Sequence, residues 1–241
     1  MHALTTKLRR IRFSIASQGL RRGLWDTLTH RMSYKPEHDH SFGRQFGTDT
    51  TAKVATADLG IEDAVRREQA ILYLASPPRV TRWMLDNIGV DYRHFTFVDL
   101  GCGKGRVLLI ASEYPFQRVV GVEISSELSE IARQNAVRYQ PASRAGRRID
   151  VENVDALQFE FPTTNLLVHM YHPFEPELTR EVLRHLEASV AALPRRVVIA
   201  YLAYTAAVEP VRGVFSEFGW LKQTRYEQSV RGQYNWIFYS N

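Results

Sequence analysis

The sequence predicts an α/β fold in which a mostly parallel sheet carries helices on both faces. Three observations lead to this prediction. Five short runs rich in β-branched and aromatic residues follow one another from residue 95, and several are apolar on both faces, as buried parallel strands require. Helical stretches separate these runs, as in a series of βαβ units. Two further runs near the C-terminus are joined by too few residues for a helical crossover.

Seven strands are expected in all. The first five are FTFVDL, RVVGVEI, IDVENV, NLLVHMY and RRVVIAYLAY, which span residues 95–100, 118–124, 149–154, 165–171 and 195–204. Helices are predicted over residues 105–113, 125–139, 176–193 and 206–218. The last two strands, residues 220–228 and 233–240, should form an antiparallel hairpin at the edge of the sheet.

Residues 1–60 are predicted to form a basic helical arm and loop, and residues 61–241 the main domain. Residues 1–35 hold eight Lys or Arg and one acid, so their net charge is 8 − 1 = +7. An arm of this charge can bind phosphates of nucleic acid or lipid. We favour instead helices that pack on the domain with solvated arginines, because a charge run is weak evidence for a partner. The apolar stripe that such helices would bury comprises Leu4, Leu8, Ile11, Ile15, Leu20, Leu24 and Leu28.

The segment between the arm and the first strand is punctuated by turn residues. Residues 36–60 are polar and predict a long ordered loop. A helix is predicted over residues 62–74, ending at the sequence SPP, and Pro77 or Pro78 can begin a further helix that runs to Gly89.

Cysteine content and hydropathy bear on the compartment. The single cysteine, Cys102, permits no disulfide within the chain, which favours a reducing environment. No apolar run approaches the about 20 residues that span a bilayer, and the N-terminus has no signal-peptide pattern. We expect a soluble, cytoplasmic protein of undetermined oligomeric state. No metal site is expected, since His38 and His40 beside Asp39 lack further ligands.

A glycine-rich turn follows the first strand of the main domain. Gly101, Gly103 and Gly105 lie between two apolar runs, in the sequence FVDLGCGKGRVLLIAS. Glycines at such a bend allow a ligand to approach the backbone, and the amides of the following helix attract an anionic group. Asp99, at the end of the strand, suits a cationic amine. Arg106 stands where the dinucleotide fingerprint G-x-G-x-x-G requires its third glycine, which disfavours a nicotinamide cofactor.

This turn resembles the first motif of the class I, Rossmann-like, seven-strand S-adenosylmethionine-dependent methyltransferases. The resemblance implies that S-adenosylmethionine is the cofactor and that Asp99 and the loop hold its methionine portion. It also implies that the acid after the second strand accepts both ribose hydroxyls and that an acid after the third accepts from the adenine amino group. The predicted cofactor-binding residues are Asp99, Gly101, Cys102, Gly103, Gly105, Glu123, Ile124, Asp155 and Ala156.

The fourth strand ends in MYHPF, at the place of the family's substrate-facing motif. Amine methyltransferases of the family often carry Asn or Asp there, before Pro-Pro-Tyr or Pro-Phe. His172 replaces that residue, which weakens amine specificity and admits a neutral imidazole as general base for a hydroxyl. We predict His172 and Tyr171 as catalytic residues, and these two with Pro173 and Phe174 as the lining of the acceptor site. A purely structural role for His172 remains open.

Two further residues, His169 and Tyr73, are assigned roles outside the catalytic set. His169 is expected to be structural, one strand face away, and Tyr73 could close over the cofactor. The stretches FGRQFGTDT and ASPPRVTRWML further resemble the lead-in of a group of bacterial methyltransferases of unassigned substrate.

The expected activity is methyl transfer to an N or O nucleophile of a protein side chain or small molecule. One alternative is a non-catalytic module that binds the cofactor or, through the basic arm, nucleic acid. Another is a nicotinamide-dependent oxidoreductase, which Arg106 and the closing hairpin disfavour.

Overall fold

A seven-stranded sheet forms the centre of the molecule, with strand order β5-β4-β3-β6-β7-β9-β8. This computed structural model describes Leu8, Ile11, Arg12, Ile15, Leu20 and residues 40–51, 53–61, 63–71, 73–141, 148–228 and 234–241. β9 runs antiparallel to both of its neighbours, and the other pairs are parallel. The strands are β3 (Phe95–Leu100), β4 (Arg118–Glu123), β5 (Ile149–Asn153), β6 (Asn165–Tyr171), β7 (Val197–Ala203), β8 (Lys222–Gln228) and β9 (Asn235–Ser240). The predicted fold class and closing hairpin are confirmed.

The strand order reverses between β3 and β6. From β3 the chain continues to β4 and β5 on one side, and it then returns to β6 on the other side of β3. In open α/β sheets, ligands bind at such a reversal, beyond the carboxyl ends of the strands. Asp99 in β3 stands directly opposite His169 in β6, so these two residues flank the reversal.

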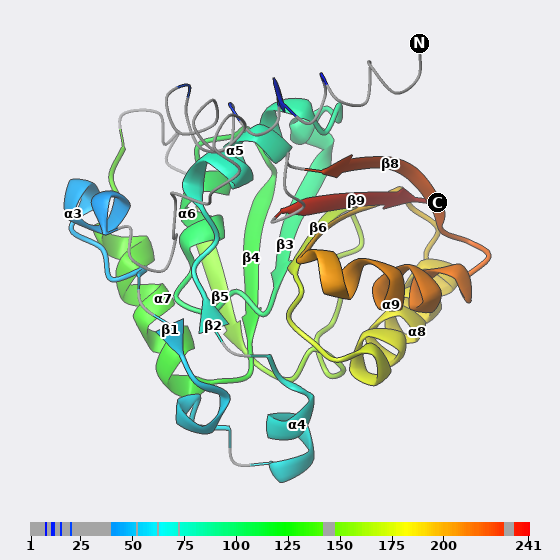
Figure 1. The fold of residues 1–241 in the computed structure, drawn as a ribbon, viewed down its shortest axis with the longest axis horizontal. Helices are drawn as coiled ribbons and strands as arrows, with labels where there is room; N and C mark the ends of the chain where they lie inside the picture. Colours follow the sequence, from blue (N-terminus) through cyan, green and yellow to red (C-terminus); the bar gives the residue numbers. More distant parts are fainter. Residues whose placement is uncertain are drawn as a thin grey trace.

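Helices cover both faces of the sheet, as Figure 1 shows. One face packs against residues of α5 (Pro78–Asn87), α6 (Arg106–Ala111) and α7 (Ser126–Arg138). The other packs against α8 (Pro176–Ala192) and α9 (Thr205–Ser216). Because successive side chains of a strand point to opposite faces, both faces of each central strand are buried, as β3 illustrates with six buried residues.

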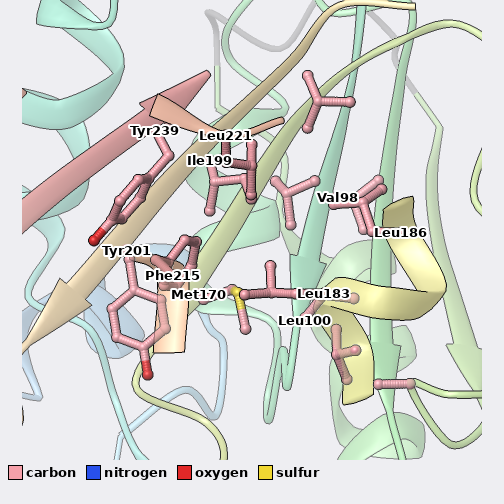
Figure 2. Packing of buried hydrophobic residues seen from close by; sticks show 14 of the residues in the cluster. Val98, Leu100, Met170, Leu183, Leu186, Ile199, Tyr201, Phe215, Leu221 and Tyr239 are labelled. Carbon is pink, nitrogen blue, oxygen red and sulfur yellow. The ribbon is translucent and has the colours of Figure 1, made fainter. Parts of the chain in front are cut away.

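The core beneath α8 and α9 contains large side chains from strands and helices (Figure 2). Leu183 and Leu186 of α8 pack in the same cluster as Val98 and Leu100 of β3. The rings of Phe215 and Tyr239 stack with their centroids 4.0 Å apart, which fixes α9 against β9. This packing holds α8 and α9 against one face of the sheet.

The segment before α5 departs from its predicted structure. The predicted helix over residues 62–74 is too long: α4 (Ala64–Gln69) ends early, and β2 (Tyr73–Leu74) pairs with β1 (Lys53–Val54). Ala70 leaves the helix to form a β-bridge with Phe174, and no local sequence signal marks that long-range pairing. The predicted loop of residues 36–60 contains α3 (Ser41–Phe46) and a 3₁₀ turn (Thr56–Asp58). A second 3₁₀ turn (Tyr92–His94) precedes β3.

Most of the predicted arm lies outside the described residues. The structure describes Leu8, Ile11, Ile15 and Leu20 of the apolar stripe, all helical, and the side chains of Leu8 and Leu20 are exposed. Leu4, Leu24 and Leu28 are not described, nor is His38 of the histidine pair. Within the described part of the chain, no helix is both long and apolar enough to cross a membrane.

A short stretch, residues 48–51, is held against the glycine loop by buried polar contacts. The Asn135 amide bonds to both the N–H and the carbonyl of Asp49, at 2.8 and 2.7 Å, and to the carbonyl of Lys104 at 2.9 Å. The Lys104 ammonium in turn contacts both carboxylate oxygens of Asp49 at 3.0 Å. These bonds attach the segment before the main domain directly to the loop after β3.

Replacing Asn135 with alanine is expected to lower the free energy of unfolding by about 2–4 kcal/mol, because it leaves buried backbone groups of Asp49 and Lys104 without their partner. Denaturant unfolding measures the change. Gln134→Ala, at the exposed neighbouring position, should alter the unfolding free energy by no more than about 0.5 kcal/mol. Equal effects of the two substitutions would contradict this account of residues 48–51.

Candidate active site

A cavity lies at the carboxyl edge of the sheet, where the strand order reverses between β3 and β6. One wall consists of the turns that follow β3, β4, β5 and β6, and the other of residues between 59 and 76. In Figure 1, α4 of this second wall lies below the sheet. The predicted site residues that line the cavity are Asp99, Gly101, Cys102, Glu123, Ile124, Asp155, Ala156, Tyr171, His172, Pro173 and Phe174.

Gly103 and Gly105 are not among the described residues that line this cavity. Their contribution is to the shape of the loop: Gly101, Gly103 and Gly105 have φ angles of 72°, 53° and 82°, a left-handed conformation that favours glycine. A β-carbon would lie 2.7 Å from Pro173 at Gly101, and 2.3 Å from the Tyr73 ring at Gly103. The protein's own packing therefore requires these two glycines, in addition to any approach by a ligand.

Substitution of Gly103 by alanine should destabilise the protein more than substitution of Gly47, whose φ is 66° but whose β-carbon would meet nothing within 4 Å. Gly47→Ala is expected to cost about 1 kcal/mol for the backbone conformation alone. Gly103→Ala adds overlap with Tyr73, about 1–3 kcal/mol more. In a Tyr73→Ala background the two costs, measured by denaturant unfolding, should converge; a persistent difference would contradict the overlap.

Glu123 lies at the end of β4, and its side chain is 7% exposed. One carboxylate oxygen accepts the Gly103 N–H at 2.8 Å and the other accepts the Ser125 N–H at 2.9 Å. Burial raises the pKa of Glu123, and these backbone hydrogen bonds oppose the rise. Each carboxylate oxygen can accept more than one hydrogen bond, so the group keeps acceptor capacity on the cavity side. Two hydroxyls of a sugar match that capacity.

Asp99 forms a buried pair with His169. The His169 Nδ1 lies 2.6 Å from a carboxylate oxygen of Asp99, and His169 is 1% exposed. His169 lines the cavity, so the expectation that it lies one strand face away from the site is wrong. Its Nε2 has no hydrogen-bond partner among the described residues. The strand register that sets these two residues side by side could not be obtained from either strand alone.

Asp155, in the turn after β5, is already engaged by the protein. One of its oxygens lies 2.6 Å from the Arg66 Nε, and the other accepts the Leu157 N–H at 2.9 Å. Arg66 comes from α4, so this ion pair joins the two walls of the cavity. An adenine amino group at this carboxylate would share it with Arg66.

His172 and Tyr171 line the cavity at the carboxyl end of β6. His172 has a φ of 39°, rare for a residue with a side chain, and its Nδ1 lies 2.9 Å from the Tyr201 hydroxyl. Burial lowers the pKa of His172, so its imidazole is neutral at neutral pH. The Tyr171 and Tyr204 hydroxyls lie 2.6 Å apart. A neutral imidazole at the cavity wall is chemically able to accept a proton.

Cys102 and Arg106 complete the loop in different ways. Burial raises the pKa of Cys102, so the residue stays a thiol, in agreement with its interpretation as a small loop residue.

Arg106 is 2% exposed and lines the cavity; it donates to the Thr50 and Thr51 hydroxyls and to the Ser76 carbonyl. In the sequence, Arg106 stands out only as a departure from the dinucleotide fingerprint. Its charge at the start of an apolar helix was a signal of a buried partner.

Comparison with known proteins agrees with this geometry. Residues 97–190 match the family model described as a methyltransferase domain. Residues 97–190 belong to a class I methyltransferase domain. The matched stretch contains the glycine loop, Glu123, Asp155 and His172, and this family uses S-adenosylmethionine as methyl donor. No curated protein matches the chain.

Solved structures share the fold of this methyltransferase at low sequence identity. A SAM-dependent methyltransferase from Aquifex aeolicus superposes with a TM-score of 0.53 and 16% identity, over 77% of this chain and 97% of that one. TrmN from Thermus thermophilus gives 0.51 and 16%, over 69% and 49%. The ribosomal protein L11 methylase from Lactobacillus delbrueckii gives 0.50 and 14%, over 68% and 77%. At these identities the likeness concerns the fold.

Proposed function

We propose that this methyltransferase moves the methyl group of S-adenosylmethionine to an N or O nucleophile of a small molecule or a protein side chain. The observation that carries the proposal is the placement of the buried carboxylate Glu123 and the neutral imidazole His172 on one cavity at the reversal of the sheet. S-adenosylmethionine supplies a methyl group activated on a sulfonium. The residues of the chain must hold it, keep water out and receive a proton from the acceptor.

Glu123 and Asp99 are the groups proposed to hold the cofactor. The Glu123 carboxylate is fixed by two backbone N–H groups, so it can accept from ribose hydroxyls without reorganising. Asp99 carries a second carboxylate on the same cavity, suited to the ammonium of the methionine portion. Gly101 and Cys102 line the same cavity. Donors and acceptors of this kind fit a zwitterionic nucleoside.

His172 is the proposed general base. An amine or hydroxyl that attacks a methyl carbon must lose a proton before or during attack, and a neutral imidazole receives it. Tyr171 and Phe174 supply aromatic surface beside it, and Pro173 closes the turn over Gly101. A positioned base can contribute about 10²–10⁴-fold to the rate.

The test combines binding with label transfer. Calorimetry of the full chain with S-adenosylmethionine should show one site, and NADH should not bind. Incubation with methyl-labelled cofactor and fractionated cell extract should then transfer label to protein or to small metabolites. Cofactor binding without transfer to any fraction would favour a non-catalytic module, and label in nucleic acid would overturn the proposed acceptor class.

A further inference from the structure

Two charged side chains flank the glycine loop. Asp99 lies near the end of β3, before the loop, and Arg106 begins α6 after it. Both residues line the cavity, and each is 2% exposed. An α-amino acid carries an ammonium and a carboxylate on one carbon, so it presents opposite charges at close range. A loop with an anion on one side and a cation on the other can match both charges.

The guanidinium of Arg106 is held by neutral groups of the protein. It donates to the Thr50 hydroxyl at 3.1 Å, to the Thr51 hydroxyl at 2.8 Å and to the Ser76 carbonyl at 3.2 Å. Its central carbon also lies 5.6 Å from the centroid of the Phe42 ring. These four groups are not ionised, so they orient the guanidinium without cancelling its charge. An anion in the cavity would stabilise a cation that is this deeply buried.

Two other cations near the loop and the cavity have acidic partners within the protein. Arg66, on the other wall, lies 2.6 Å from a carboxylate oxygen of Asp155. The Lys104 ammonium lies 3.0 Å from both carboxylate oxygens of Asp49, and Lys104 is not among the described residues that line the cavity. Arg106 is therefore the cation that an anionic ligand group beside the glycine loop would meet.

We propose that Arg106 binds the carboxylate of the methionine portion of S-adenosylmethionine, while Asp99 binds its ammonium. This inference rests on the proposed function for the identity of the cofactor. A planar guanidinium matches a planar carboxylate, and hydrogen bonds between such charged groups are stronger than those between neutral ones. Thr50, Thr51 and Ser76 then act as positioning residues, because they set the direction of the guanidinium. The site selects ligands that carry the carboxylate.

Decarboxylated S-adenosylmethionine tests this selection directly. The compound keeps the nucleoside, the sulfonium and the ammonium, and it lacks only the carboxylate. In calorimetry of the full chain, S-adenosylmethionine should bind about 10–100-fold more tightly than the decarboxylated compound, the range expected for hydrogen bonds between charged groups. Equal Kd values in the wild type would overturn the inference and leave the proposed function standing. Absence of binding by both ligands would overturn the proposed function as well.

Arg106→Gln shows whether this residue sets the preference. The ratio of the two Kd values should fall to within about threefold, because the cation that recognises the carboxylate is lost. A merely structural role would weaken both ligands by the same factor and keep the wild-type ratio, which would overturn the inference. If glutamine prevents folding, Arg106→Lys takes its place. A single ammonium lacks the planar fork, so the ratio should fall at least about threefold, and an unchanged ratio would contradict the assignment.

Arg66→Gln is the matched control, because it removes the other arginine in the described lining of the cavity. Its partner Asp155 follows β5, which lies two strands away from β3. The ratio of the two Kd values should therefore stay at the wild-type value, whatever happens to the affinities themselves. An equal loss of preference in Arg66→Gln and Arg106→Gln would assign the selection to the net charge of the cavity and overturn the role of Arg106.

Discussion

Replacing His172 with asparagine is expected to lower kcat for methyl transfer by about 10²–10⁴-fold, because an amide cannot take the proton that the neutral imidazole accepts. The resemblance to amine methyltransferases makes asparagine an informative choice, since those enzymes often carry it here. The Kd for S-adenosylmethionine should remain within about threefold, because Glu123, the residue proposed to bind the ribose, is unchanged. Label transfer to the identified acceptor measures kcat, and calorimetry measures Kd.

The same residue predicts a pH dependence. Burial lowers the pKa of His172, and a base acts only when deprotonated. Turnover should therefore fall as pH falls through a value below the ordinary histidine pKa of about 6.5, and stay high above it. His94→Asn, an exposed histidine outside the cavity, serves as control and should change neither kcat nor the profile. An undiminished kcat in His172→Asn would limit His172 to a structural role.

Replacement of Glu123 by alanine should weaken S-adenosylmethionine binding at least about 100-fold, or about 3 kcal/mol, because two hydrogen bonds to a buried carboxylate are lost. The pKa of Glu123 is raised by burial. Because the ionised form is the acceptor, affinity should fall as pH falls through a value above the ordinary glutamate range. Titration calorimetry across pH measures both effects.

Glu123 also supports the loop, so the variant needs a control for folding. Its carboxylate accepts from Gly103 and Ser125, and thermal unfolding of Glu123→Ala reports the loss of these bonds. Glu123→Gln retains an acceptor oxygen and the side-chain volume, and should bind with intermediate affinity. Glu130→Ala removes an exposed acid from the adjoining helix and should leave affinity unchanged. Equal Kd values for Glu123→Ala and wild type, with the fold intact, would remove Glu123 from the cofactor site.

The sheet was predictable because its signals are local. β3 and β6 match the predicted ranges, and β4, β5, β7, β8 and β9 differ from theirs by up to two residues at an end. Apolar runs between turn residues carry this information. The glycine loop was equally visible, since Asp99 and its glycines are adjacent in the chain. The family match over residues 97–190 agrees with that interpretation.

Long-range pairing explains what was not predictable. The helix predicted over residues 62–74 ends at Gln69 because Ala70 pairs with Phe174, about a hundred positions later. His169 lies in the site because β6 aligns it with Asp99. Arg106 finds its partners in residues 50, 51 and 76. Each of these contacts depends on a register or an approach that neither partner's local sequence specifies.

The bridge between Ala70 and Phe174 joins the two walls of the cavity. The region that matches the family model, residues 97–190, supplies the turns after β3, β4, β5 and β6 on one wall. Residues 59–76, which precede it, form the other wall and are bridged to the turn after β6. Any movement of residues 59–76 away from the sheet would therefore have to break both this bridge and the Arg66–Asp155 ion pair.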